Sequence, residues 1–147
     1  MHGVVSTAPA SAVVLVDGGD VLLTRQARFA VDAVVLEVVK GGSHDGETAL
    51  ACAIRESREE AGVVAARWVP LGSCYEIPSI VEHPVALFLG TALTPAPLDP
   101  EDVERIEIVR MPFDDALRAC ADGRIDDAVS AIALLRAKHA LTSRAGP

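Results

Sequence analysis

One stretch of the chain, from Gly41 to Gly62, constrains the fold more than any other feature of the sequence. Its glycines and charged residues stand at fixed spacings, namely Gly41, Glu47, Arg55, Glu56, Glu59, Glu60 and Gly62. From residue 48 to residue 61 the pattern is helical, with an apolar stripe formed by Leu50, Ile54, Ser57 and Ala61. Gly62 is suited to ending this helix, because glycine adopts the left-handed conformation without strain. The sequence therefore predicts a glycine-containing loop that leads into a helix.

The glutamates of this helix predict a cluster of carboxylates. At about 100° per residue, Glu56 and Glu60 lie one turn apart on the same face, with Glu59 on their flank. Like charges at this spacing repel each other, and a hard divalent cation would remove that cost. Mg²⁺ or Mn²⁺ prefers oxygen ligands and bridges carboxylates to phosphates. A short run of charges is ordinarily a solvated helix face, but the full spacing of the stretch favours a metal site.

Strands are predicted on both sides of this helix. Residues 11–16 and 21–24 form a hairpin around a pair of glycines that tolerate the turn. Residues 31–39 are nearly all apolar, and we expect a strand covered on both faces. Further strands are predicted at 63–75, 84–93 and 105–111, with loops at 77–79 and 94–100, and helices at 112–123 and 126–141. This order of elements predicts an α/β sandwich of the α+β type with a mixed sheet.

Composition bounds the class of protein. A length of 147 residues fits one domain, 1–147, and we expect flexible ends at about 1–10 and 142–147. The net charge of −8 and the scattered arginines argue against a nucleic-acid partner. Acidic residues interrupt the apolar N-terminal third and no secretory pattern precedes it, so we expect a cytoplasmic protein without a membrane span. The three widely spaced cysteines indicate free thiols.

With these residues in view, the stretch from Gly41 to Val63 resembles the Nudix box, G-x5-E-x7-R-E-U-x-E-E-x-G-U, where U is a bulky aliphatic residue. All seven fixed letters match. Ser57 departs from the pattern at a position where the family has an aliphatic residue. The resemblance implies a Nudix-type α/β/α sandwich with the box loop and helix at the active site, and a metal-dependent hydrolase whose partner is a small nucleotide.

The resemblance also implies roles for the residues of the box. Glu56 and Glu60 would be the main metal ligands, and Glu59 would be a further ligand or the base that orients water. Arg55 would orient Glu59. The metal would polarise a diphosphate and lower the pKa of the attacking water. The backbone carbonyl of Lys40 would be available to the metal, and the remaining box positions would support the loop or approach the substrate, namely Glu47, Gly62, Gly41 and Gly42.

Outside the box the chain resembles the ADP-ribose pyrophosphatase branch of the family. Residues 24–28 resemble V-R-Q-Y-R, which makes Arg28 either a phosphate clamp or an exposed strand arginine. Residues 37–41 resemble E-L-P-A-G, which implies that Glu37 helps to hold the nucleoside or ribose. Residues 122–130 resemble the G-E-I-x-D-x-x-T turn of the branch, which supports membership more than it assigns chemistry.

The loop after Pro78 is expected to supply a catalytic glutamate, because the branch carries one there. Glu82 is the acidic residue of this loop, although it comes about one residue early. His83 and Glu59 stay open as rival bases. Phe29 and Tyr75 are the aromatic residues that could stack on a nucleobase, with burial in the core as the alternative for each.

The favoured function is metal-dependent hydrolysis of ADP-ribose or a related nucleotide sugar to a nucleoside monophosphate and a sugar phosphate. Two alternatives stay open, a pyrophosphohydrolase of nucleoside triphosphates and a non-catalytic Nudix domain that senses a ligand. The complete set of glutamates favours catalysis. Relatives in this branch exchange an N-terminal β-region between subunits, and only about ten residues precede the first expected strand here. Dimerisation by this exchange is therefore not expected, and a homodimer as such stays open.

Overall fold

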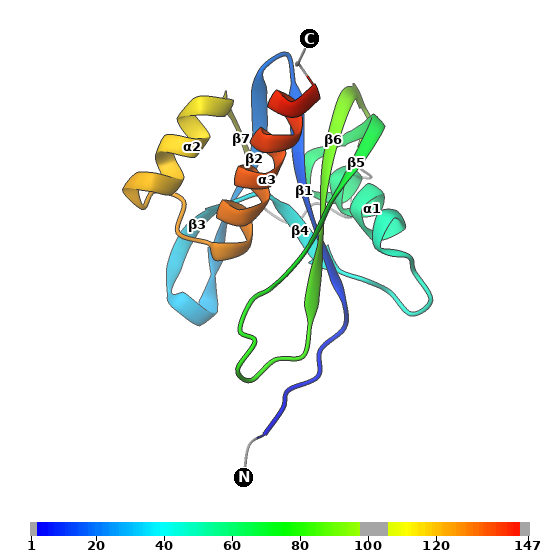
Figure 1. Ribbon diagram of the computed structural model, residues 1–147, viewed down its shortest axis with the longest axis vertical. Helices are drawn as coiled ribbons and strands as arrows, with labels where there is room; N and C mark the ends of the chain where they lie inside the picture. The colour runs from blue at the N-terminus through cyan, green and yellow to red at the C-terminus, as the bar shows by residue number, and fades with distance from the viewer. Residues whose placement is uncertain (1–2, 98–105, 145–147) are drawn as a thin grey trace.

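The structure is a computed structural model that describes residues 3–97 and 106–144. The described strands form one mixed sheet in the order β3-β2-β1-β6-β5, while β4 pairs with β1 and β7 pairs with β2. The strands are β1 (Ala10–Asp17), β2 (Asp20–Arg28), β3 (Ala33–Glu37), β4 (Val39–Gly42), β5 (Val63–Tyr75), β6 (Pro84–Pro95) and β7 (Glu107–Pro112). The helices are α1 (Ala49–Ala61), α2 (Phe113–Asp122), α3 (Ala128–Arg144) and the short 3-10 helix η1 (Phe29–Val31). Helix α1 lies on one side of the sheet and α2 and α3 on the other (Figure 1), so the α/β/α sandwich is as predicted.

Strand β1 is the centre of the sheet. It pairs antiparallel with β2 and β4 and parallel with β6. Successive side chains of a strand point to opposite faces. Ala12 and Val14 accordingly join the core beneath α2 and α3, whereas Val13 and Leu15 join the core beneath α1. Both hydrophobic layers therefore depend on this one strand.

Helix α1 has a defined cap at each end. The side chain of Thr48 accepts a hydrogen bond from the backbone N–H of Ala51 at 3.1 Å. Gly62 adopts the left-handed conformation with φ of 63°, and its N–H donates to the Arg58 carbonyl at 3.0 Å. Side-chain caps of this kind stabilise a helix by about 1 kcal/mol. The prediction that Gly62 ends the helix is confirmed.

The face that α1 turns towards the sheet differs from the predicted apolar stripe. Leu50 is exposed, and the buried residues of the helix are Cys52, Ala53, Glu56 and Ser57. The small side chains of Cys52, Ala53 and Ser57 let the helix lie close to the sheet. The Ser57 hydroxyl donates to the Ala53 carbonyl at 2.8 Å. A buried polar group is thereby paired, which accommodates serine where the Nudix pattern has an aliphatic residue.

The predicted strand over residues 31–39 is wrong in part. The chain forms η1, turns at Asp32 with a positive φ of 48°, and then forms β3 and β4 as separate strands. Among the described strands β3 pairs with β2 alone, and its Val34 is exposed rather than covered. An edge strand has one neighbour and fewer packing partners, so a run of apolar residues is not sufficient to bury it.

Most other elements agree with the sequence analysis. The hairpin of β1 and β2 turns at Gly18 and Gly19, which both have positive φ. Helix α3 runs to Arg144, beyond the expected end at 141, and β7 begins at Glu107. Residues 98–100 of the expected loop and Arg105 of the expected strand lie outside the described residues. Cys52, Cys74 and Cys120 are free thiols.

The described part of the N-terminal segment contacts the rest of the chain at Val5 and at Pro9, whose carbonyl accepts from the Ser43 N–H at 2.7 Å. The N–H of Val5 donates to the Ile80 carbonyl at 2.8 Å, and Val5 forms an isolated bridge with Val81.

Among the helices of residues 3–97 and 106–144, none combines the length and apolar character that a membrane crossing requires.

Two neighbouring leucines of α3 test this packing. Leu134 is fully buried in the core beneath α2 and α3, whereas Leu135 is 67% exposed. We expect Leu134→Ala to lower the free energy of unfolding by about 2–5 kcal/mol, because it leaves a cavity. Leu135→Ala should change it by less than about 0.5 kcal/mol. Urea denaturation followed by circular dichroism measures both, and equal losses would contradict the orientation of α3.

Candidate active site

The Arg55 guanidinium connects the β4–α1 loop to the helix. Its Nε and Nη2 contact the two carboxylate oxygens of Glu47 at 2.9 and 3.0 Å, and Nη1 contacts Glu56 at 2.7 Å and Glu59 at 3.0 Å. Nη2 also donates to the Gly42 carbonyl at 2.8 Å. The Arg55 hydrogen bond and the His44 N–H lower the pKa of Glu47 to about 2. Glu47 is thus held in its charged form as a fixed partner of Arg55.

Glu56 lies in a narrow space between α1 and β4. It is 8% exposed, and burial raises the pKa of its carboxyl even though Arg55 opposes the shift. A Cβ atom at Gly41 would lie only 2.2 Å from the Glu56 carboxyl carbon. Glycine at position 41 is therefore what allows the carboxylate to occupy this place.

Glu60 is the second partly buried carboxylate of the helix. Burial, with the nearby Glu56 carboxylate as the next cause, raises its pKa to about 8. One carboxylate oxygen accepts from the backbone N–H of Lys40 at 3.4 Å. Glu59 lies further out and is about half exposed. These three side chains, with Gly42, His44, Arg55 and Ile106, line a cavity of about 380 Å³.

The donor set fits a hard divalent cation. Carboxylates that burial has made costly to ionise are stabilised by a nearby positive charge, and oxygen atoms are the ligands such a cation prefers. In the described part of the chain no three acidic, histidine or cysteine side chains form a ready coordination shell. Arg55 holds Glu56 and Glu59, and Glu60 turns to the Lys40 amide. The predicted ligands are neighbours, and their carboxylates point to different partners.

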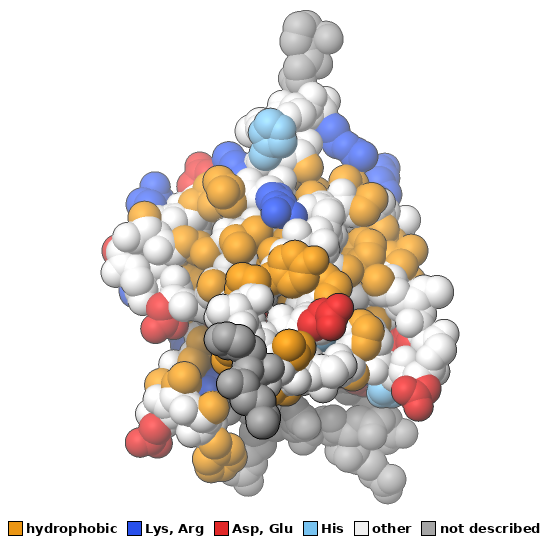
Figure 2. All heavy atoms as spheres, turned by 60° about the horizontal axis from the view of Figure 1, so that its bottom comes forward, with side chains coloured by type: hydrophobic (Ala, Val, Ile, Leu, Met, Phe, Trp, Pro, Cys, Tyr) orange, Lys and Arg blue, Asp and Glu red, His pale blue; other side chains and the backbone are white. Residues whose placement is uncertain are grey.

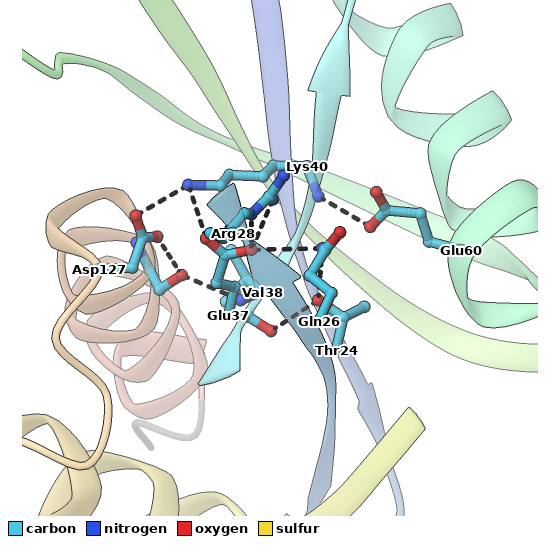
Figure 3. Close-up of polar contacts among 9 residues, drawn as sticks. Thr24, Gln26, Arg28, Glu37, Val38, Lys40, Glu60 and Asp127 are labelled. Atoms are coloured by element: carbon cyan, nitrogen blue, oxygen red, sulfur yellow. Dashed lines mark hydrogen bonds and ion pairs between the residues drawn. The ribbon is translucent and has the colours of Figure 1, made fainter. Parts of the chain in front are cut away.

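A second group of charged side chains lies at the other side of β4 (Figure 3). Glu37 is 3% exposed and accepts from Arg28 at 2.6 Å. The Lys40 ammonium lies 2.8 Å from Asp127 and 3.4 Å from Glu37. Asp127 also accepts from the Ser130 N–H at the start of α3 at 2.9 Å. Two cations and two carboxylates thus join β2, β3 and β4 to α3.

This cluster changes the interpretation of three predicted residues. Arg28 is paired with Glu37 rather than free, and Glu37 is occupied by protein groups on both oxygens. Lys40, considered in the sequence only for its carbonyl, contributes a side chain to the site. Asp127 was not predicted from the sequence. The signal available for it was local, because aspartate is a preferred residue immediately before the first residue of a helix, where its side chain accepts a backbone N–H of the first turn.

Two further cavities flank the charged cluster. The one between β4 and β6 has a volume of about 390 Å³ and is lined by Gly41, Gly42, His83 and Val85 among others. The one between the β2–β3 connection and α3 has a volume of about 740 Å³ and is lined by Val31, Val35, Glu37 and Asp126 among others. Both are also lined by Arg28, Lys40 and Glu76. Gly42 in turn lines both the first of these and the glutamate cavity.

The two candidate bases in the loop after Pro78 differ in their exposure. Glu82 is exposed, and the adjacent His83 is buried. The aromatic candidates are exposed too, Phe29 completely and Tyr75 by 57%, so neither belongs to the core. Phe29 begins η1 and Tyr75 ends β5. Figure 2 shows apolar side chains gathered on one face of the molecule, and the exposed large apolar residues of the chain include Val31, Val34, Ile77 and Ile80.

Comparison with known proteins agrees with this geometry. The NUDIX domain family matches residues 6–132. The ADP-ribose pyrophosphatase of Bacillus subtilis (strain 168) is 27% identical over 132 residues, which cover 87% of this chain and 71% of that protein. The crystal structure of an ADP compounds hydrolase superposes with a TM-score of 0.84, covering 92% of this chain and 74% of that chain at 23% identity. The last similarity shows a shared fold.

The contact between Gly41 and Glu56 can be tested directly. We expect Gly41→Ala to weaken Mn²⁺ binding by about 10- to 100-fold, because the added methyl group displaces a carboxylate of the site. Thermal stability should change little, since the displaced atoms end a flexible side chain. Gly42→Ala adds the same methyl group where the nearest atom is 4.0 Å away, so its effect should be smaller. Electron paramagnetic resonance of free Mn²⁺ measures the affinity, and equal losses in the two variants would contradict this assignment.

Proposed function

This chain belongs to the Nudix family of pyrophosphohydrolases, and from that premise we propose that it hydrolyses a nucleoside diphosphate joined to a sugar. Its preferred substrates are ADP-ribose or a related nucleotide sugar. Water is added across the phosphoanhydride bond, which gives a nucleoside monophosphate and a sugar phosphate. The similarity to an ADP-ribose pyrophosphatase and to an ADP compounds hydrolase supports this choice.

The observation that carries the proposal is the arrangement of the three cavities. The glutamate cavity shares Gly42 with the cavity between β4 and β6, which shares Arg28 and Lys40 with the cavity beside α3. A nucleotide sugar has a group on each side of its diphosphate, and such a ligand requires binding space that extends away from the site of cleavage. A triphosphate ends at its terminal phosphate and would leave the far cavity unused.

The residues of the box would act together on the diphosphate. Glu56, Glu59, Glu60 and the Lys40 carbonyl would hold a divalent cation, which when bound neutralises phosphate charge and lowers the pKa of a bound water. Arg55 keeps Glu56 and Glu59 in place through the contacts described above. Glu47 fixes Arg55 through both carboxylate oxygens. Gly41 and Gly42 let the backbone approach the phosphates closely.

The second cluster would hold the remainder of the substrate. Arg28 is positioned by Glu37, and a guanidinium of fixed orientation can bind a phosphate through two parallel hydrogen bonds. Lys40 is held in the same way by Asp127 and Glu37. In this proposal Glu37 acts on the substrate through the two cations that it orients.

A panel assay tests the proposed function. We expect ADP-ribose with Mg²⁺ to give AMP and ribose 5-phosphate, and chelation with EDTA to stop the reaction. Glu60→Gln should lower the rate on the order of 10²–10³-fold, because it removes a charge that acts on the transition state. Glu107→Gln changes an exposed glutamate paired with Arg25, so the variant should retain full activity.

Chromatography of the products distinguishes the alternatives. Pyrophosphate released from nucleoside triphosphates, with every nucleotide sugar untouched, would exclude the proposed substrate and select a triphosphate pyrophosphohydrolase. Binding of these compounds without turnover, and without any effect of chelation, would select a non-catalytic sensor.

A further inference from the structure

His83 presents a buried polar atom that the fold leaves unpaired. The residue immediately precedes β6 and is 7% exposed. Its Nδ1 has no hydrogen-bond partner, and within the described part of the chain it is the one buried side-chain nitrogen or oxygen in this condition. Leaving such an atom unpaired is unfavourable, and a missing ligand is one physical reason for it. A histidine with a purely structural role would be expected to have a partner for this atom.

The surroundings of His83 indicate what that ligand would be. His83 lines the cavity between β4 and β6 together with Gly41 and Gly42. Gly42 also lines the glutamate cavity, so the cavity lined by His83 adjoins the glutamate cavity at this residue. A ligand that extends from the glutamates into this cavity would meet the imidazole.

The charges in the same cavity favour a phosphate-containing ligand. Arg28 and Lys40 line it, and each is already oriented by a carboxylate, Glu37 or Asp127. Glu76 is the acidic residue that lines the same cavity. Two oriented cations beside two glycines can bind an anion, and the imidazole adds a hydrogen bond of defined direction. This combination matches the phosphate and ribose oxygens of a nucleotide sugar.

Building on the proposed function, we infer that His83 is a substrate-contacting residue whose Nδ1 forms a hydrogen bond with an oxygen of the diphosphate-ribose part of the nucleotide sugar. Glu82, the acidic residue of the same loop, is exposed and lines none of the three cavities described above. The burial of His83 and its place in the cavity therefore favour it over Glu82 as the residue of this loop that contacts the substrate.

Direct binding in the absence of catalysis tests this role. ADP-ribose is titrated calorimetrically into the full chain with EDTA present, so that affinity is measured without turnover. We expect His83→Leu to weaken binding about tenfold, the usual effect of losing one hydrogen bond. The melting temperature should stay the same or rise, because an apolar side chain replaces a buried atom that had no partner. His83→Gln retains a hydrogen-bonding group and should recover part of the affinity.

Two matched variants complete the design. His139→Leu changes an exposed histidine of α3 and should bind like the unaltered protein. Glu82→Gln tests the rival residue of the loop. The inference is overturned if Glu82→Gln carries the loss of affinity and His83→Leu does not. It is also overturned if His83→Leu lowers the melting temperature while affinity is unchanged, which would show a structural role.

The same experiment keeps this inference separate from the proposed function. If the unaltered protein binds and hydrolyses ADP-ribose and His83→Leu behaves identically, the inference fails and the function stands. If the protein instead binds ATP and not ADP-ribose, the proposed substrate fails, and a loss of ATP affinity in His83→Leu would still support contact with the ligand phosphates. Failure to bind any compound of the panel with EDTA, together with no turnover of any of them with Mg²⁺, would overturn both.

Discussion

The charge balance around Arg55 holds the rest of the site in place. Glu47, Glu56 and Glu59 would repel one another within this small volume, and a single guanidinium contacts all three. Its planar fork of donors also reaches the Gly42 carbonyl, so the loop and the helix are fixed relative to each other. Gly42 lines both the glutamate cavity and the cavity between β4 and β6. The hydrogen bond from Arg55 to Gly42 therefore sets the position of the glutamates relative to the second cavity. Lysine could not replace this residue, since an ammonium group presents no such planar fork of donors.

The parts of this arrangement that the sequence predicted are local in the chain. The limits of α1 follow from a helical pattern with Gly62 at its end, and those signals lie within a few residues of the structure they specify. The hairpin of β1 and β2 follows from a pair of glycines between two apolar runs. Glu56 and Glu60 were expected on one face of the helix because helical geometry requires it.

The parts that the sequence did not predict depend on residues far apart in the chain. Lys40 and Asp127 are separated by 87 positions, and nothing near either residue indicates that they form an ion pair. The break between β3 and β4 depends on which strand each one pairs with, which an apolar run does not encode. The buried face of α1 differs from the predicted stripe because Glu56 is buried and Leu50 is exposed. The missing side chain at Gly41 leaves room for the Glu56 carboxylate, and a helical pattern does not encode that contact.

The alternation of side chains along β4 has a consequence for how enzymes of this construction can diverge. Gly41 lies against Glu56 on the α1 side of the sheet, whereas the side chain of its neighbour Lys40 reaches Asp127 on the α3 side. In the proposed function, consecutive residues of one strand would thus contribute to two separate tasks, the cleavage of a bond and the selection of what is cleaved. Substitutions on the α3 side could alter the range of accepted compounds through many generations while the hydrolytic apparatus on the opposite side remained unchanged.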